Sequence, residues 1–346
     1  MNRAFVFLLI YFIFAASAGA QLNPIRYAMI PENPCPGDPV TIGVSGNVKQ
    51  AVLAVNGRIL ARADFFPVPA ADGNQGFMAA VLTIPNTLSS ASMLVEIRLE
   101  NENRIITIIP VVMTVREFEA ETIRLDRLLT DIRTDASPQR VAESNLLWSV
   151  LSATGSDVYH TGSFIPPVSS TRRTSSFGER RIYVYSDGGR DTSIHAGLDY
   201  GVPTGTEVAA CGNGKVVLAR SMIVAGNAVI LEHAPGIYSL YYHLSRIDVT
   251  EGVLVTAGTV IGLSGATGLA TGPHLHWDIR VNTETTDPDA FLARPIIDKE
   301  LIISKIYNSV IRKPPLLNQA RFVSSITNTF SHPANFRLAG WKIQDD

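Results

Sequence analysis

Cysteine is scarce in this chain, and two familiar cysteine and histidine motifs are missing. Only Cys35 and Cys211 occur among the 346 residues, and no CxxC pair is present. The two cysteines lie in different predicted domains, so a disulfide between them would join those domains. We expect instead two unpaired, buried residues, because a free cysteine packs like a small apolar side chain. HExxH is also absent, which excludes a thermolysin-like zinc helix with a glutamate base.

An excess of positive charge is missing as well. The chain has 29 Lys and Arg against 31 Asp and Glu, a net charge of −2. We therefore expect no nucleic-acid partner. A hydrophobic content of 46% with 17% charged residues is typical of a globular protein with a large core.

Long apolar runs are absent except at the N-terminus. Residues 1–20 carry Arg3, an apolar run over 4–14 and the small residues Ala18-Gly19-Ala20. This pattern is typical of a secretory signal peptide that is cleaved after Ala20. The alternative is an uncleaved anchor, because the run approaches the lower limit for spanning a membrane. We expect an exported protein of the periplasm, cell envelope or extracellular space, with no membrane span after cleavage.

Short strands dominate residues 21–115, and this predicts a mostly β chain. Val40, Ile42 and Val44 alternate with polar or small residues, and Asn56-Gly57 suits a tight type I′ hairpin turn. Strands at this spacing indicate an N-terminal immunoglobulin-like β-sandwich. Both a spacer role and a binding role for this domain stay open.

Three further segments complete the predicted order. Residues 116–164 read as a helical linker, with Ser137 as a helix cap, Pro138 in the first turn and Trp148 expected in the core. Residues 165–293 read as strands and turns and form the predicted catalytic domain. Residues 294–346 predict a C-terminal helix and a tail that packs on either domain.

The clearest motif is HLHWDIR at residues 274–280. A strand of period two separates its residues into two sets. Leu275, Trp277 and Ile279 point to the core, while His274, His276, Asp278 and Arg280 share the other face.

The earlier segment HAGLD contributes a further imidazole and a further carboxylate. His195 and Asp199 are four residues apart, so a strand would place them on one face. Gly197, Gly201 and Pro203 favour a strand over a helix. Two imidazoles and one carboxylate, with water in the fourth position, form an open catalytic zinc site. We therefore predict that His195, Asp199 and His276 bind Zn²⁺.

Two histidines remain near this predicted metal site. His274 belongs to the HLH segment, and His243 lies in YYHLS, where a strand places it on one face with Ser239 and Tyr241. Their residue type suits general acid/base catalysis or stabilisation of an oxyanion. We expect His243 and His274 to be catalytic.

Together these motifs resemble those of the lysostaphin-type, or LytM-like, zinc endopeptidases. The family pattern HxGxD, YxHLS and TGPHLHW is matched by HAGLD, YYHLS and TGPHLHW, and TSSFGERR and GNAVILEH also fit. The similarity covers about residues 165–293. It implies a compact antiparallel β fold, one zinc ion and hydrolysis of peptide bonds in bacterial peptidoglycan. By position, the family's ligands fall on His195, Asp199 and His276, and its catalytic histidines on His243 and His274.

Two alternative functions stay open at this point. Some relatives have lost metal ligands and activate other wall enzymes, so a non-hydrolytic wall-binding protein or activator is one alternative. The other is hydrolysis of a different exported peptide. The substrate bond, Gly-Gly or a D-amino-acid cross-link, also stays open.

The remaining polar and aromatic residues have less specific interpretations. His233 is expected to be structural, and His160 and His332 to be solvated. Four arginines form a predicted basic edge that is either solvated or meets a substrate carboxylate. Three tyrosines are predicted to be core residues or to line the groove. The four arginines are Arg172, Arg173, Arg180 and Arg181. The three tyrosines are Tyr183, Tyr200 and Tyr241.

Overall fold

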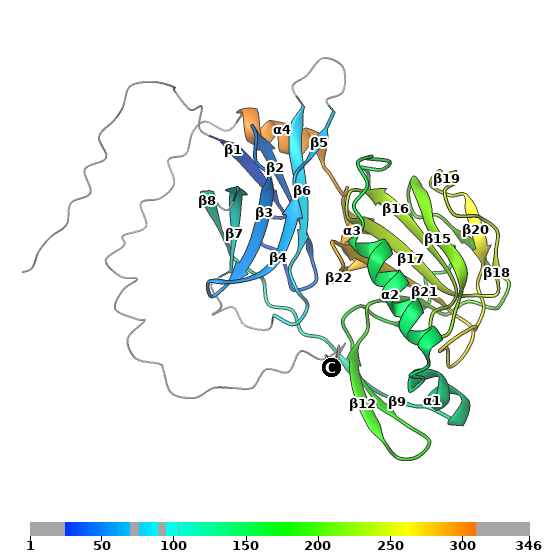
Figure 1. Ribbon diagram of the computed structural model, residues 1–346. Coiled ribbons are helices and arrows are strands. Elements are labelled where there is room, and N and C mark those ends of the chain that lie inside the picture. The colour runs from blue at the N-terminus through cyan, green and yellow to red at the C-terminus, as the bar shows by residue number, and fades with distance from the viewer. Residues whose placement is uncertain (1–24, 70–75, 89–94, 103, 309–346) are drawn as a thin grey trace, which may run out of the picture.

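The computed structural model describes residues 25–69, 76–88, 95–102 and 104–308. Figure 1 shows two β-rich halves joined by a segment that contains two helices. The predicted mostly β fold is confirmed. The predicted signal peptide, the C-terminal tail and His332 lie outside the described residues. Within the described ranges, no helix is long and apolar enough to cross a membrane.

The N-terminal half is a sandwich of two four-stranded antiparallel sheets. Val40, Ile42 and Val44 are fully buried between the sheets, as their alternation predicts. The strands are β1 Arg26–Ile30, β2 Pro39–Ser45, β3 Gln50–Val55, β4 Arg58–Asp64, β5 Phe66–Val68, β6 Phe77–Thr83, β7 Val95–Asn101 and β8 Arg104–Val111. They form sheets of order β1-β2-β6-β5 and β4-β3-β7-β8.

The turn between β3 and β4 has the predicted conformation. Asn56 and Gly57 have φ angles of 48° and 80°. A type I′ turn requires positive φ at both central residues, and asparagine and glycine tolerate this conformation best. The predicted hairpin is therefore confirmed.

The C-terminal half is built on an eight-stranded antiparallel sheet. Its strands, in spatial order, are β10 Arg173–Ser175, β13 Gly197–Tyr200, β21 Leu275–Val281, β17 Ile237–Leu244, β16 Gly226–Ala234, β15 Gly214–Met222 and β19 Leu254–Val255, and β22 Glu284–Thr286 pairs with β21. A small sheet contains β14 Glu207–Ala209, β20 Val260–Leu263 and β18 Arg246–Ile247.

The segment predicted as a helical linker also contributes a strand. Strand β9, Ala120–Arg124, pairs in parallel with β11, Arg180–Val184, and β11 pairs with β12, Arg190–Ile194. The helical prediction is therefore incomplete for this segment. Parallel pairing joins residues about 60 positions apart, and local sequence patterns do not reveal such a partner.

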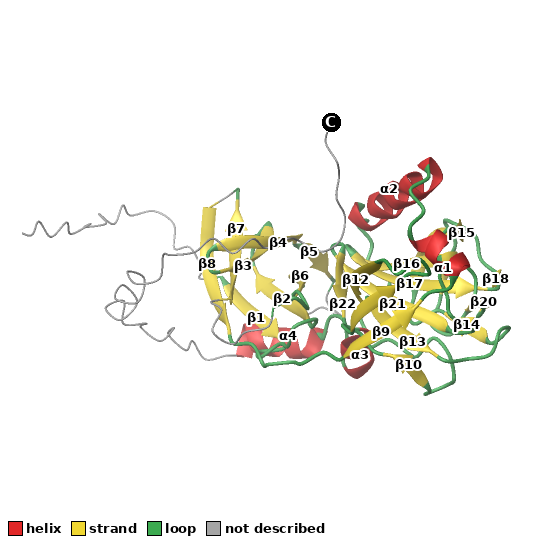
Figure 2. Ribbon diagram, turned by 90° about the horizontal axis from the view of Figure 1, so that it is seen from below, coloured by secondary structure: helices red, strands yellow, loops and turns green. Residues whose placement is uncertain are grey.

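Two helices follow β9: α1, Arg127–Arg133, and α2, Pro138–Ser152. Ser137 caps α2 and Pro138 lies in its first turn, as predicted. Helix α2 lies across the sheet of the C-terminal half (Figures 1 and 2). Leu151 packs on that sheet, but Trp148 is 64% exposed, so its predicted place in the core is wrong.

The C-terminal part of the described chain returns to the N-terminal half. Helix α3 spans Pro288–Ala293, and α4 spans Lys299–Asn308. Ile302 and Ile306 are fully buried, and α4 lies along β1 and β2 (Figure 2). Gly43 of β2 makes room for Ile302, because a Cβ atom there would overlap that side chain. The predicted C-terminal helix therefore packs on the sandwich.

Candidate metal and catalytic site

The floor of the candidate site is the junction between β13 and β21. Asp199 of β13 and His276 of β21 are direct cross-strand neighbours, so their side chains leave the sheet side by side. The close approach of the two strands depends on Gly197, because a Cβ atom there would overlap the carbonyl oxygen of Trp277. Glycine is the residue that permits such an approach.

His195 reaches the same point from outside the strand. β12 ends at Ile194 and β13 begins at Gly197, so His195 lies in the connection between them. The prediction that His195 and Asp199 share the face of one strand is therefore wrong, although their side chains do meet. β12 and β13 belong to different sheets, so His195 lies where the chain passes from one sheet to the other.

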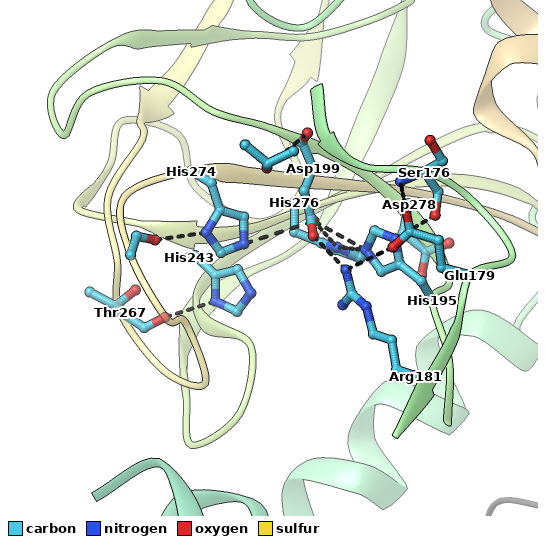
Figure 3. A network of polar contacts seen from close by, with 12 residues as sticks. Ser176, Glu179, Arg181, His195, Asp199, His243, Thr267, His274, His276 and Asp278 are labelled. Carbon is cyan, nitrogen blue, oxygen red and sulfur yellow. Dashed lines mark hydrogen bonds and ion pairs between the residues drawn. The ribbon is translucent and has the colours of Figure 1, made fainter. Parts of the chain in front are cut away.

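The three predicted ligand residues converge on one point (Figure 3). His195 Nε2 is 3.1 Å from both Asp199 Oδ1 and His276 Nδ1, and the latter two atoms are 2.8 Å apart. All three residues are buried. Ligands of a tetrahedral zinc ion, each at about 2.0–2.1 Å, lie roughly 3.3 Å from one another. The donor atoms and their spacing therefore fit a zinc ion.

Outer contacts fix the orientation of this His–Asp–His cluster. His195 Nδ1 donates to the Ser176 carbonyl at 2.8 Å, which leaves Nε2 free to bind a metal. The second oxygen of Asp199, Oδ2, accepts from Arg181 at 2.9 Å. Beyond Arg181 lies Glu179, at 3.7 Å.

The charge state of the cluster follows from burial and these contacts. Burial by itself raises the pKa of Asp199, but its close contacts with the imidazoles of His195 and His276 hold that pKa well below its usual range. Burial lowers the pKa of His276. The cluster therefore holds a carboxylate beside a neutral imidazole, and both are forms that bind a cation.

His243 reaches the site through a bulge in β17. Its φ angle is 63°, and the pairing of β17 with β16 shifts by one residue between Tyr241 and Leu244. Tyr241 points into the core, whereas the His243 ring lies 4.8 Å from that of His274. The prediction that His243 shares a face with Ser239 and Tyr241 is therefore wrong. A left-handed residue other than glycine is costly, and such residues cluster at functional sites.

Both remaining histidines have the same hydrogen-bond arrangement. His243 Nδ1 donates to the Thr267 carbonyl, and His274 Nδ1 donates to the Gly272 carbonyl, each at 2.8 Å. A carbonyl oxygen only accepts, so the Nδ1 atoms carry the protons and each neutral ring keeps a lone pair on Nε2. His274 Nε2 is 3.8 Å from Asp199 Oδ1. Burial, followed by the two neighbouring histidines, lowers the pKa of His243 to about 3.

A groove of about 430 Å³ opens above these residues. His243, His274 and His276 line it together with Asp199. One wall is the loop before β21, and the other is formed by β9 and β11. The lining residues from these walls are Leu269, Thr271, Gly272 and Pro273, and Glu121, Ile123, Leu125, Arg181 and Tyr183.

The four arginines expected at one basic edge are dispersed. Arg181 is partly buried beside Asp199, and Arg173 forms a two-pronged ion pair with Asp289. Arg180 donates to the Asn86 carbonyl of the N-terminal half at 2.6 Å. Of the three tyrosines considered, only Tyr183 lines the groove, while Tyr200 and Tyr241 are core residues.

The other histidines and the cysteines lie away from the groove. His233 is fully buried and bonds to Ser239 and the Asn213 carbonyl, which agrees with a structural role. His160, expected to be solvated, is only partly exposed, and its ring stacks on Phe164. Cys35 and Cys211 are both free, as expected, and Cys211 is buried.

The sequence does not predict the contact of Arg181 with Asp199 or the position of Glu121 in the groove. For Arg181, the segment TSSFGERR is a signal that could have identified it. Glu121 lies in a segment without a recognisable motif, and its position depends on the pairing of β9 with β11.

The fold and the site define a β-rich domain with a potential metal-binding cluster in an open groove. Residues 193–288 match Peptidase family M23. The chain therefore carries a peptidase family M23 domain, and the resemblance to lysostaphin-type proteins is confirmed.

Curated relatives match this same part of the chain. The DD-carboxypeptidase/endopeptidase Mpg of Neisseria meningitidis is 40% identical over 124 residues, which cover 36% of this chain and 28% of the relative. The peptidoglycan DD-endopeptidase ShyA of Vibrio cholerae is 40% identical over 116 residues, which cover 34% of this chain and 26% of ShyA. The chain thus matches between a quarter and a third of the length of these relatives.

A solved structure shares the fold over a larger part of the chain. A peptidase M23 from Pseudomonas aeruginosa aligns with a TM-score of 0.51 at 24% identity. The alignment covers 75% of this chain and 94% of that protein. The shared fold therefore extends beyond the matched family region.

Proposed function

We propose that this protein is a zinc-dependent endopeptidase that hydrolyses peptide cross-links in bacterial peptidoglycan. The observation that carries the proposal is the convergence of His195, Asp199 and His276, within 2.8–3.1 Å of one another, beside two further histidines in one groove. A wall-binding protein without catalysis has no need of that complete set.

His195 Nε2, Asp199 Oδ1 and His276 Nδ1 would hold the zinc ion. When bound, zinc acts as a Lewis acid that makes water a stronger nucleophile and polarises a carbonyl group. Arg181 keeps Asp199 Oδ2 occupied, so the carboxylate presents a single oxygen to the metal. The Ser176 carbonyl holds the His195 ring in the orientation that directs Nε2 inward.

His243 and His274 supply the proton-handling groups. Their Nδ1 atoms are held by carbonyls, so only the Nε2 atoms are free to exchange protons. One Nε2 accepts the proton of the attacking water and delivers it to the leaving amine. The other, when protonated, donates a hydrogen bond to the oxygen that becomes negative during attack. The left-handed backbone conformation at His243 accompanies a ring position 4.8 Å from the ring of His274, so both imidazoles are within reach of one substrate bond.

The substrate class follows from the relatives and the groove. Mpg is named a DD-carboxypeptidase/endopeptidase, and ShyA is named a peptidoglycan DD-endopeptidase. We therefore place the scissile bond of this protein in a D,D cross-link between stem peptides. The signal peptide predicted at residues 1–20 would deliver the enzyme to the cell envelope, where this substrate occurs.

The proposal is tested by hydrolysis of dye-labelled peptidoglycan and of labelled casein. We expect zinc-loaded protein to release dye from peptidoglycan and to leave casein intact. Chelation should abolish release, and added zinc should restore it. The His195→Ala, Asp199→Ala and His276→Ala variants should each lose zinc, because too few ligands remain. Binding to peptidoglycan without release would establish the non-catalytic alternative, and cleavage of casein alone would establish a different peptidase.

A further inference from the structure

The wall of the groove opposite His274 includes a strand from outside the matched family region. β9 pairs with β11 so that Glu121 lies beside Arg181 and Ile123 beside Tyr183. All four of these residues line the groove with the catalytic histidines. The segment that connects the two halves therefore forms part of the surface that a substrate meets.

Side chains along this wall change from polar to apolar. Glu121 is exposed, Ile123 is half-buried and Leu125 is buried, and all three line the groove. Alternate residues of a strand share one face, so the carboxylate and the two aliphatic side chains follow one another along the wall. Such a surface matches a ligand with an aliphatic stem and a cationic end.

The carboxylate of Glu121 is free to bind a cation. The nearest strand neighbour with a positive charge, Arg181, is already engaged by Asp199 at 2.9 Å and by Glu179 at 3.7 Å. Among the described residues, no Lys, Arg or His nitrogen forms an ion pair with Glu121. The wall thus carries one carboxylate whose charge is not matched by a protein group.

Contacts at both ends of β9 hold this wall in place. At the start, Phe118 packs under the Arg180 guanidinium at 4.5 Å and against Phe177. At the end, the Leu125 amide donates to the Val184 carbonyl at 2.9 Å. Asp126 then caps α1 by accepting from the Leu129 amide. A recognition surface fixed in this way binds without a large ordering cost.

We propose that Glu121, with Ile123 and Tyr183, forms a subsite for a primary ammonium group on an aliphatic side chain of the substrate. In cross-linked peptidoglycan this group is the free side-chain amine of the diamino acid in the stem that supplies the D-alanine carbonyl, because the corresponding amine of the other stem forms the scissile amide. The Glu121 carboxylate accepts hydrogen bonds from the ammonium group, and Ile123 and the Tyr183 ring pack on the methylene stem. This assignment rests on the proposed function, and it makes Glu121 a specificity-determining residue.

The experiment compares two synthetic stem tetrapeptides that differ only at the lysine amine, which is free in one and acetylated in the other. Calorimetry measures the binding of each to the zinc-loaded full chain. We expect the free amine to bind about 5- to 20-fold more tightly, the usual range for one charge-assisted hydrogen bond in a partly exposed site. Glu121→Gln should remove this preference and leave the zinc content unchanged. Glu119→Gln, in the same segment but outside the groove lining, should retain it.

The outcomes separate the subsite from the proposed function. Equal binding of both peptides by the unaltered chain, binding of neither, or a preference that survives in Glu121→Gln would overturn the subsite. A second assay then follows cleavage of a cross-linked stem dimer. A protein that shows the Glu121-dependent preference but leaves the dimer intact would refute the endopeptidase function while retaining the subsite.

Discussion

The two oxygens of Asp199 have different neighbours, and this division shapes the whole site. Oδ1 faces the imidazoles of His195 and His276, whereas Oδ2 accepts from Arg181. A carboxylate held in this way keeps one oxygen directed at the metal position without losing entropy on binding. Arg181 is therefore a positioning residue whose effect passes through Asp199.

Replacing Arg181 should weaken metal binding without unfolding the protein. For Arg181→Met we expect zinc affinity to fall by about 10- to 100-fold, the usual cost of losing an outer partner of a metal ligand. Competition with a chromogenic chelator measures this change. Arg220→Met, which removes a surface arginine paired with Glu251, is the matched control and should bind zinc normally. Equal affinities in the two variants would show that Arg181 does not position Asp199.

His243 tests the separation of catalysis from coordination. Because its φ angle is 63°, asparagine is the better replacement, since it tolerates the left-handed conformation. We expect His243→Asn to keep its zinc and to lose about 10²–10⁴ in turnover of peptidoglycan, the usual size of an acid/base contribution. Zinc content and turnover are measured on one preparation. Loss of zinc would make His243 a ligand, and full activity would remove it from the mechanism.

His233 gives the stability of the protein a pH dependence. Burial lowers its pKa from 6.5 to about 3, while His160 and Cys211 lie beside it. Between these values the unfolded chain binds a proton that the folded chain does not. The free energy of unfolding should therefore fall as the pH drops from about 6.5 toward 3, by about 1 kcal/mol per pH unit from this group.

Chemical denaturation at pH 7, 6 and 5 measures this slope. In His233→Gln the free energy of unfolding should change less steeply with pH, by about 1 kcal/mol per pH unit. A variant with the same slope as the unaltered protein would show that other groups control the acid sensitivity.

At the scale of the elements, local periodicity predicted some features well and missed others. The alternation in HLHWDIR correctly placed Leu275, Trp277 and Ile279 in the core. Asn56-Gly57 and Ser137-Pro138 correctly marked a hairpin and a helix start. In each case the signal and the structure involve residues close in sequence.

The predictions that were wrong concern features that depend on residues far away in the sequence. The bulge at His243 exists only in relation to β16, and the placement of β9 exists only in relation to β11. From the sequence, Trp148 is expected in the core, but helix α2 has only one side against the sheet and Trp148 is exposed. The clustering of His195, Asp199 and His276 was predictable because their residue types and spacings are unusual. The orientation of its rings depends on carbonyls that no motif identifies.

Helix α4 provides a test of how the C-terminal segment contributes to the fold. Ile302 is fully buried against β2, whereas its neighbour Leu301 is 39% exposed. Ile302→Ala should lower the free energy of unfolding by about 2–5 kcal/mol, because it leaves a cavity. Leu301→Ala, the matched control, should cost less than about 1 kcal/mol. Similar losses in the two variants, measured by urea denaturation, would show that α4 does not pack as described.

At the scale of the whole molecule, one apolar core crosses both halves. It includes Ala28 and Val81 from the sandwich, and Trp277, Phe291 and Ile302 from the rest of the chain. Polar contacts also cross the boundary. They include Thr83 Oγ1 with Thr286 Oγ1 at 2.6 Å, Asn282 donating to the Val81 carbonyl at 2.7 Å, and Arg116 with Asp287 at 2.6 Å. The sandwich therefore packs directly against the region that carries the groove.

The central claim is that this chain cuts peptide bonds of peptidoglycan with zinc bound by His195, Asp199 and His276. Mass spectrometry of the fragments released from purified peptidoglycan tests that claim most directly. The account predicts stem peptides separated at their D,D cross-links with intact glycan strands, produced by the zinc-loaded chain and absent with His276→Ala. The claim would be contradicted if folded, zinc-loaded protein released no peptide fragments or released fragments cut only in the glycan.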